Sequence, residues 1–454
     1  MNKDMGSLSV GKLLWQFSWP TIIGMLVNAL YNIVDRIFVG RALGSLAIAA
    51  TTVAFPIMLV FFAVSMLIGV GATALISIRL GEQKKAEAEQ ISGNALVLLV
   101  FIPLLLSLIY LFFPEQILIM FGANDDVLPY ALEYTNVIVL GSVFGAISFG
   151  LNNFIRAEGK PKISMMTQLL GAFVNVILNY VFIFELGMGM KGSALGTIIG
   201  QCVSACWVLG YFLFARSTLK LRLKNFKPDP LITRRILAIG FAPFAMQIAG
   251  SVQQMLLNKS VMTFGGDLAL SAVGVVMSLS TIFFMPIVGI SQGAQPIIGY
   301  NYGAKQFSRV TETLKKAALI GICLATAGFF VIRLWPEQII GLFSNGDAAL
   351  TEIAVHAMLT FLALLPVLGF QIVAANYFQA VGKPLQSTIL TLSRQVLIFI
   401  PLLLILPNFW GIEGVWRTAP IADALSILLT ISFIFIEMKS LLSKQRVAEV
   451  NTPA

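Results

Sequence analysis

Asp35 places a carboxylate inside an apolar stretch of the sequence, YNIVDRIFVG (residues 31–40). Asn28, Asn32 and Asp35 are spaced four and three residues apart, so on a helix they form one polar face. An ionisable side chain within a membrane-spanning segment is costly, and it generally faces the protein interior and serves function. The pattern therefore favours an ion site. The simpler alternative is a superficial pair with Arg36 that reaches the water interface.

Three further oxygen-bearing side chains are candidate partners for this carboxylate. Asn175 and Asn179 are four residues apart in NVILNYVFIF, and Thr197 lies in the next apolar segment. A carboxylate, two amide oxygens and a hydroxyl are hard ligands, suited to Na⁺ or to proton exchange. Asn and Thr also commonly form hydrogen bonds between membrane helices, and the spacing alone leaves both interpretations open.

A second polar stripe follows later in the chain, at Gln247, Ser251, Gln254 and Asn258. At an offset of about 223 residues, Asp35 aligns with the uncharged Asn258. Two such stripes suggest two facing cavity walls. Because only one of them carries an acid, we expect any ion site to lie in the N-terminal half.

The composition indicates the elements that must position these residues. Hydrophobic residues make up 58% of the 454 and charged residues only 11%, whereas soluble domains carry about 25% charged residues. Apolar runs of about 20 residues, the length needed to cross a bilayer, recur throughout the chain. We expect an all-α polytopic membrane protein of twelve transmembrane helices, roughly at 13–40, 46–78, 92–113, 131–155, 163–184, 192–215, 235–264, 268–300, 311–334, 350–380, 386–406 and 416–438.

The net charge of +9 reflects topology, not a nucleic-acid partner. With the N-terminus in the cytoplasm, 23 of the 30 Lys and Arg residues fall on cytoplasmic segments. Only four fall outside, at Arg41, Lys191, Arg333 and Arg417. This positive-inside bias places both termini in the cytoplasm. The polar start of the chain and its long first apolar run do not match a cleavable signal peptide.

An internal duplication organises the chain. FFPEQILIMFGANDD (112–126) matches LWPEQIIGLFSNGDA (334–348), and AEGKPKIS (157–164) recurs as AVGKPLQS (380–387). Because each half has an even number of helices, both copies enter the membrane from the same side, as parallel repeats do. Two such halves around a central cleft are typical of an alternating-access transporter.

The expected organisation follows from this duplication. Residues 1–215 form an N-terminal six-helix lobe and residues 216–232 a basic cytoplasmic linker. Residues 233–440 form the C-terminal lobe, and residues 441–454 a polar cytoplasmic tail. Pro20 removes a helical hydrogen bond, so it is the candidate hinge of the first helix.

Three motifs together resemble the multidrug and toxic compound extrusion (MATE) family, in particular its bacterial MepA-like branch. They are YNIVDRIFVG, the repeated GKP after the fourth and tenth helices, and the two PEQI segments. The resemblance covers residues 10 to 440. It implies two six-helix lobes arranged as a V in a bacterial or archaeal cell membrane. It also implies export of bulky organic cations in exchange for H⁺ or Na⁺.

The resemblance also implies site residues. The family's cation site in the N-terminal lobe maps to Asp35, Asn175, Asn179 and Thr197, with Asn179 standing where the family has a second acid. Na⁺ is the candidate metal ion there. The stretches that carry acids in the seventh and tenth helices of some members carry none here. Coupling is therefore expected to rest on Asp35.

The ligand site is expected to be broad and soft, because Phe and Met side chains repack around varied aromatic cations. Six residues on or beside the two polar stripes are the candidates: Asn28, Tyr31, Met246, Gln254, Met277 and Met285.

The sequence argues against two rival functions. A flippase for lipids or lipid-linked sugars usually lines its cavity with several basic residues, whereas the only bases embedded away from the helix ends are Arg36, Lys259 and Arg394. A membrane enzyme would need a nucleophile with a base, or clustered metal ligands, and the sequence shows neither pattern. We expect no enzymatic activity and no cofactor besides the coupling ion. The partners are small organic cations and the bilayer, and the chain is expected to be a monomer.

Overall fold

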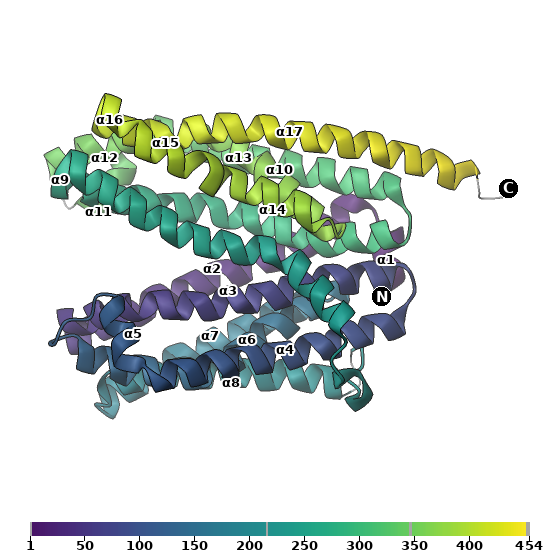
Figure 1. The fold of residues 1–454 in the computed structure, drawn as a ribbon, viewed down its shortest axis with the longest axis horizontal. Coiled ribbons are helices and arrows are strands. Elements are labelled where there is room, and N and C mark those ends of the chain that lie inside the picture. The colour runs from purple at the N-terminus through teal and green to yellow at the C-terminus, as the bar shows by residue number, and fades with distance from the viewer. Residues whose placement is uncertain (1, 215–216, 345–346, 451–454) are drawn as a thin grey trace. The chain divides into compact units, whose positions relative to one another are not determined.

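The computed structural model describes residues 2–214, 217–344 and 347–450, and every regular element among them is helical. The elements, shown in Figure 1, are α1 (Asn2–Ser7), α2 (Val10–Leu43), α3 (Ser45–Gly81), α4 (Lys85–Phe112), α5 (Pro114–Met120), α6 (Leu128–Ala157), α7 (Pro161–Tyr180), η1 (Val181–Glu185), α8 (Gly189–Leu213), η2 (Leu223–Phe226), α9 (Pro230–Gly303), α10 (Phe307–Leu334), α11 (Pro336–Ser344), α12 (Ala348–Phe361), α13 (Leu365–Ala380), α14 (Pro384–Leu392), η3 (Ser393–Phe399), α15 (Ile400–Ile405), α16 (Pro407–Trp410) and α17 (Ile412–Val450). η1 and η3 are π-helical, and η2 is a 3-10 turn.

The helices account for the twelve expected membrane crossings. In the described part of the chain, ten helices are long and apolar enough to span a bilayer, and the bent pair α12 and α13 makes an eleventh. α9 has 74 residues, about 110 Å of helix, and the backbone breaks at Gly266, where φ is 70°. Because a bilayer core is about 30 Å thick, α9 supplies two crossings. The all-α membrane fold is thereby confirmed.

Two expected boundaries fall inside continuous helices or outside the described residues. α17 continues to Val450, so residues 441–450 of the expected tail are helical. Residues 215–216, where the expected first lobe ends, and residues 451–454 lie outside the described part.

The chain forms two compact units, and two helices contribute to both. The first unit comprises Met1–Met5 and Trp19–Phe244, and the second comprises Gly6–Ser18 and Ala245–Ala454. α2 therefore begins in the second unit and ends in the first, whereas α9 begins in the first and continues in the second. The two changes of unit fall beside Pro20 and Pro243, which occupy equivalent positions in the duplicated sequence.

A very close helix crossing fixes the start of α9 in the first unit. A Cβ placed on Gly240 would lie 1.7 Å from the carbonyl oxygen of Leu67 in α3. A Cβ on Gly71 would lie 2.2 Å from the carbonyl oxygen of Ile236. Only residues without a side chain permit this approach, so glycine on both helices brings the two backbones into contact.

The second unit has an equivalent contact at the start of α2. A Cβ on Gly293 of α9 would lie 2.9 Å from Cα of Ser18. The Arg309 side chain also donates a hydrogen bond of 2.6 Å to the carbonyl oxygen of Leu8. Thus the first turns of α2 are bound to the second unit, just as the first turns of α9 are bound to the first.

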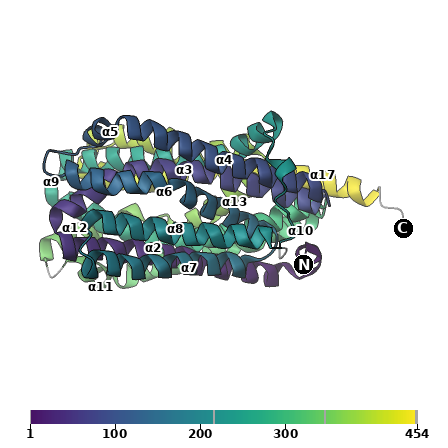
Figure 2. The same ribbon diagram turned by 90° about the horizontal axis from the view of Figure 1, so that it is seen from below.

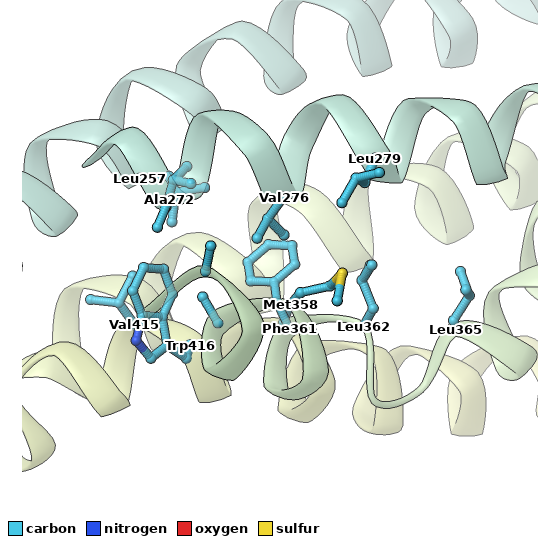
Figure 3. Packing of buried hydrophobic residues seen from close by; sticks show 14 of the residues in the cluster. Leu257, Ala272, Val276, Leu279, Met358, Phe361, Leu362, Leu365, Val415 and Trp416 are labelled. Carbon is cyan, nitrogen blue, oxygen red and sulfur yellow. The ribbon is translucent and has the colours of Figure 1, made fainter. Parts of the chain in front are cut away.

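A hydrophobic core in the second unit joins α9, α12 and α17. Leu257 and Val276 of α9 are buried in one cluster with Phe361 of α12 and Trp416 of α17 (Figure 3). Met358, which is fully buried, fills the space beside Phe361. Burial of a large apolar side chain contributes about 1.5–3 kcal/mol. The part of α9 on both sides of the break at Gly266 is therefore secured by side-chain packing.

In the second unit, the partly exposed Arg394 forms an ion pair with the buried carboxylate of Asp423. Arg394 Nε lies 2.6 Å from Asp423 Oδ1, and Asp423 is 1% exposed. Arg394 projects from the π-helical segment η3, and Asp423 lies in α17. The pair joins two helices that are far from Asp35 in sequence. The positive charge of Arg394 balances the negative charge of Asp423.

We expect Arg394→Met to destabilise the protein by about 3–5 kcal/mol, because it leaves the Asp423 carboxylate buried and unpaired. The measurement is the melting temperature of the purified protein in detergent. The double variant Arg394→Met/Asp423→Leu should recover most of the loss, since it removes both charges. If the double variant melts no higher than the single one, the ion pair does not act as an isolated couple.

Candidate functional site

Small residues on α8 make room for the polar face of α7. The two helices run side by side in the first unit (Figures 1 and 2). A Cβ on Gly196 would lie 2.0 Å from Asn179 Oδ1, and one on Gly200 would lie 3.1 Å from Asn175 Cβ. The glycines are four residues apart, as are the asparagines, so the two helical faces match. Both amide side chains are consequently buried.

Asp35 of α2 meets this face of α7. Asn179 Nδ2 donates to Asp35 Oδ1 at 2.5 Å, and also lies 3.4 Å from Asn175 Oδ1. Asn175 Nδ2 in turn donates to Thr197 Oγ1 at 3.1 Å. The structure thus brings together all four residues expected at the ion site, in one hydrogen-bonded chain within the first unit. Asp35 is half-buried at the end of that chain.

Ser193 also belongs to this cluster, although it is not among the site residues predicted from the sequence. Its hydroxyl donates to Asp35 Oδ1 at 3.0 Å, and the residue is fully buried. Ser193 precedes Thr197 by four residues on α8, so both lie on the same helical face. That spacing was the signal by which the sequence could have revealed it.

The cluster has an acceptor with no partner. Asn179 is 0% exposed, and its Oδ1 accepts no hydrogen bond from any residue in the described part of the chain. A buried amide oxygen without a donor carries a desolvation cost. A proton on the neighbouring carboxyl group, or a small cation, would offset that cost. Carboxylate, amide and hydroxyl oxygens are the ligands that a hard ion such as Na⁺ prefers, so the residues present fit either ion.

Arg36 does not neutralise Asp35. The guanidinium lies 5.8 Å from the ring centroid of Phe55 in α3, a cation–π contact. Among the described residues, no ion pair joins Arg36 to Asp35. The superficial Asp35–Arg36 ion pair is therefore not formed: Arg36 acts on the carboxylate at longer range, and the hydrogen bonds to Asp35 come from the neutral Asn179 and Ser193.

Three aromatic side chains cluster one turn beyond Asp35. Phe38, one turn after Asp35, packs edge-on against Phe184 at a centroid distance of 5.5 Å. Tyr180, which follows Asn179, stacks against Phe184 at 5.4 Å and meets Phe38 at 6.3 Å. The three rings thus join α2, α7 and η1 in one aromatic cluster next to the Asp35 site.

The expected ligand-contact residues divide between the units. In the first unit Asn28 is exposed and Tyr31 is partly buried, whereas the side chain of Asn32 lies outside the described part. In the second unit four candidates are partly buried: Met246, Gln254, Met277 and Met285. Gln254 Nε2 donates to Asn258 Oδ1 at 2.8 Å, so the second polar stripe is hydrogen-bonded along α9. Met277 packs against the core of its unit.

Comparison with known proteins matches both halves of the chain to one family. The family model described as MatE matches residues 20–181 and again residues 243–405. The two matches begin 223 residues apart, at Pro20's position and at Pro243's position. They confirm the duplication seen in the sequence.

Relatives of known type are similar over almost the whole chain. The multidrug export protein MepA of Staphylococcus haemolyticus is 28% identical over 432 residues, with 94% of each chain covered. The MATE multidrug transporter DinF-BH, solved in complex with R6G, is 37% identical, with a TM-score of 0.88 and 95% and 96% coverage of the two chains. A structure of MATE in complex with MaL6 has a TM-score of 0.91 at 24% identity and covers 97% of this chain and 99% of that one, which shows the shared fold.

Proposed function

Since the chain belongs to the MATE family of multidrug efflux transporters, we propose that it exports bulky organic cations by alternating access, in exchange for H⁺ or Na⁺. Family membership makes the protein a multi-pass membrane transporter of the MepA-like kind and not an enzyme. Coupling to H⁺ or Na⁺ and the organic-cation substrates are the parts of this proposal that family membership does not establish.

The Asp35 cluster supports ion coupling. Asp35 faces Asn179 and Ser193, both neutral, and Asn179 Oδ1 lacks a donor in the described structure. An ionised Asp35 attracts an organic cation, and a proton or Na⁺ arriving from outside neutralises the carboxylate and releases that cation. The ion and the cargo thus compete for one charge, which is the linkage that antiport requires.

Substrate contacts are proposed on the two polar stripes and the soft side chains beside them. Asn28 and Tyr31 would contribute from the first unit, and Met246, Gln254, Met277 and Met285 from the second. DinF-BH was solved in complex with R6G, so we propose that such a ligand is also a substrate here. Thioether and aromatic side chains accommodate ligands of differing shape, which suits a multidrug exporter.

The orientation follows the distribution of basic residues. We propose that both termini lie in the cytoplasm of a bacterial or archaeal cell, where the positive-inside rule places most Lys and Arg. Pro20 of α2 is proposed as the hinge of the transport cycle: it withholds one backbone hydrogen bond just where α2 passes from one unit to the other. A single chain is proposed to carry out transport.

Efflux from proteoliposomes tests this function. Protein is reconstituted with ethidium or R6G inside, and an inward gradient of H⁺ or of Na⁺ is imposed separately. Antiport predicts that one of the two gradients accelerates loss of dye relative to vesicles without a gradient. Equal rates under both gradients and under none would rule out coupling to either ion. A flippase would instead accelerate exchange of labelled lipid between leaflets.

A further inference from the structure

The segment between α8 and α9 is held to the first unit by buried polar side chains. Glu158, at the end of α6, is 0% exposed and accepts a hydrogen bond of 2.6 Å from the backbone N–H of Leu219. It also accepts hydrogen bonds from the hydroxyls of Tyr211 and Ser217. Three donors converge on one carboxylate, so the start of this linker (residues 217–229) has a defined path.

Two residues of α4 fix the remainder of the linker. Asn94 Nδ2 donates to the carbonyl oxygens of Asn225 and Lys227 at 3.1 and 3.3 Å, and its Oδ1 accepts from Asp229 N at 2.6 Å. Glu89 accepts from Lys220 N at 3.2 Å. Because a side chain of α4 satisfies the backbone at both ends of η2, the linker is an ordered part of this surface.

The side chains that point away from this backbone are mostly basic and unpaired. Five exposed residues form a basic surface: Lys220, Lys224, Lys227, Arg234 and Arg235. None of them takes part in an ion pair with another described residue. Arg222 is the exception, since it lies 3.4 Å from Glu89. The acids near the linker are thus used to hold its backbone and leave the outer charges free.

Large apolar side chains lie in the linker and directly on either side of it. Leu223 is 86% exposed and lies between basic residues on η2, and Phe214, at the end of α8, is 80% exposed. Leu231, in the first turn of α9, is exposed as well. Apolar side chains beside unpaired cations, at the level where two membrane helices end and begin, are typical of a surface that meets lipid headgroups.

We propose that this basic surface binds anionic phospholipid headgroups of the adjoining leaflet, with Leu223 inserted between the lipids. The charges complement phosphate, and each Lys or Arg near an anionic surface strengthens the attraction. A soluble acidic partner would gain little from Leu223 and Phe214, whereas a lipid surface takes up both the charge and the apolar side chains. The placement on the cytoplasmic leaflet rests on the proposed orientation; the binding itself does not depend on transport.

Lipid-selective quenching tests the proposal. The three native cysteines are first replaced by serine (Cys202→Ser, Cys206→Ser and Cys323→Ser). A bimane fluorophore is then attached at the new cysteine of Leu223→Cys. The labelled protein is reconstituted with brominated phosphatidylglycerol or brominated phosphatidylcholine at equal mole fraction. We expect the anionic lipid to quench at least about twofold more strongly, and the preference to fade in 0.5 M salt.

Charge variants test whether the lipid preference depends on this basic surface or only on the net charge of the protein. Lys220→Gln/Lys224→Gln/Lys227→Gln should abolish the lipid preference. A control with the same loss of charge at three scattered exposed sites, Lys162→Gln/Lys305→Gln/Lys315→Gln, should keep it. Equal quenching by the two lipids, or a preference that survives the triple variant, would each overturn the proposal. Dye efflux from the same vesicles reports separately on the proposed function.

Discussion

Asp35→Asn should reduce gradient-driven dye efflux to the level of protein-free vesicles while leaving the fold intact. The replacement amide keeps an oxygen that can accept the hydrogen bonds from Asn179 and Ser193, so the geometry of the cluster is retained. It removes the charge for which we propose that cargo and coupling ion compete. Because no basic residue pairs with Asp35 in the described structure, its loss leaves no cation unpaired.

The matched control is Asp267→Asn, which removes an exposed carboxylate beside the break in α9. It should export at the wild-type rate. The melting temperature of Asp35→Asn should equal or exceed that of the wild type, since a half-buried charge is costly to the folded state. Gradient-driven efflux by Asp35→Asn at the wild-type rate would show that another group carries the coupling.

Gly240→Ala should destabilise the first unit by about 3 kcal/mol or more and lower the melting temperature by about 5 °C or more. The new methyl group would meet the carbonyl oxygen of Leu67 at 1.7 Å, so α3 and the start of α9 must separate. The neighbouring atom is backbone, which cannot turn aside as a flexible side chain can. The same region joins α9 to the first unit, so the change should also impair export.

Gly274→Ala provides the comparison, because a Cβ at that position meets no atom within 4 Å. Ala has the higher helix propensity, so this variant should be as stable as the wild type or slightly more stable. Thermal unfolding of the two purified variants in the same detergent gives the answer. Similar melting temperatures for both would mean that α3 and α9 do not pack as closely as described.

Hydrophobic length and duplication were sufficient to predict the architecture. Twenty-residue apolar runs report directly on the bilayer, and the repeated PEQI and GKP segments fixed the offset between the halves. The exchange of helix starts between units was not predicted. It depends on contacts such as Gly240 with Leu67, which join segments far apart in sequence and follow no local period.

The candidate site, too, was predicted only in part from the sequence. Spacings of three and four residues identified Asp35, Asn175 and Asn179, because such spacings place residues on one helical face. Ser193 was missed because a small hydroxyl in a helix is usually a packing residue. The direction of the Arg36 side chain could not be predicted from the sequence either. Neighbouring residues on a helix point about 100° apart, and the contact with Phe55 in the structure shows where the guanidinium lies.

Ion release on ligand binding shows whether cargo and coupling ion compete for Asp35. Purified protein in weakly buffered detergent solution is mixed with R6G or ethidium, and released H⁺ or Na⁺ is counted against ligand bound. If the two compete for Asp35, about one ion is released per chain in the wild type and none in Asp35→Asn, since the effects of the two ligands on each other are reciprocal. Saturation of the wild type with ligand and no release of either ion, or equal release from Asp35→Asn, would contradict this competition.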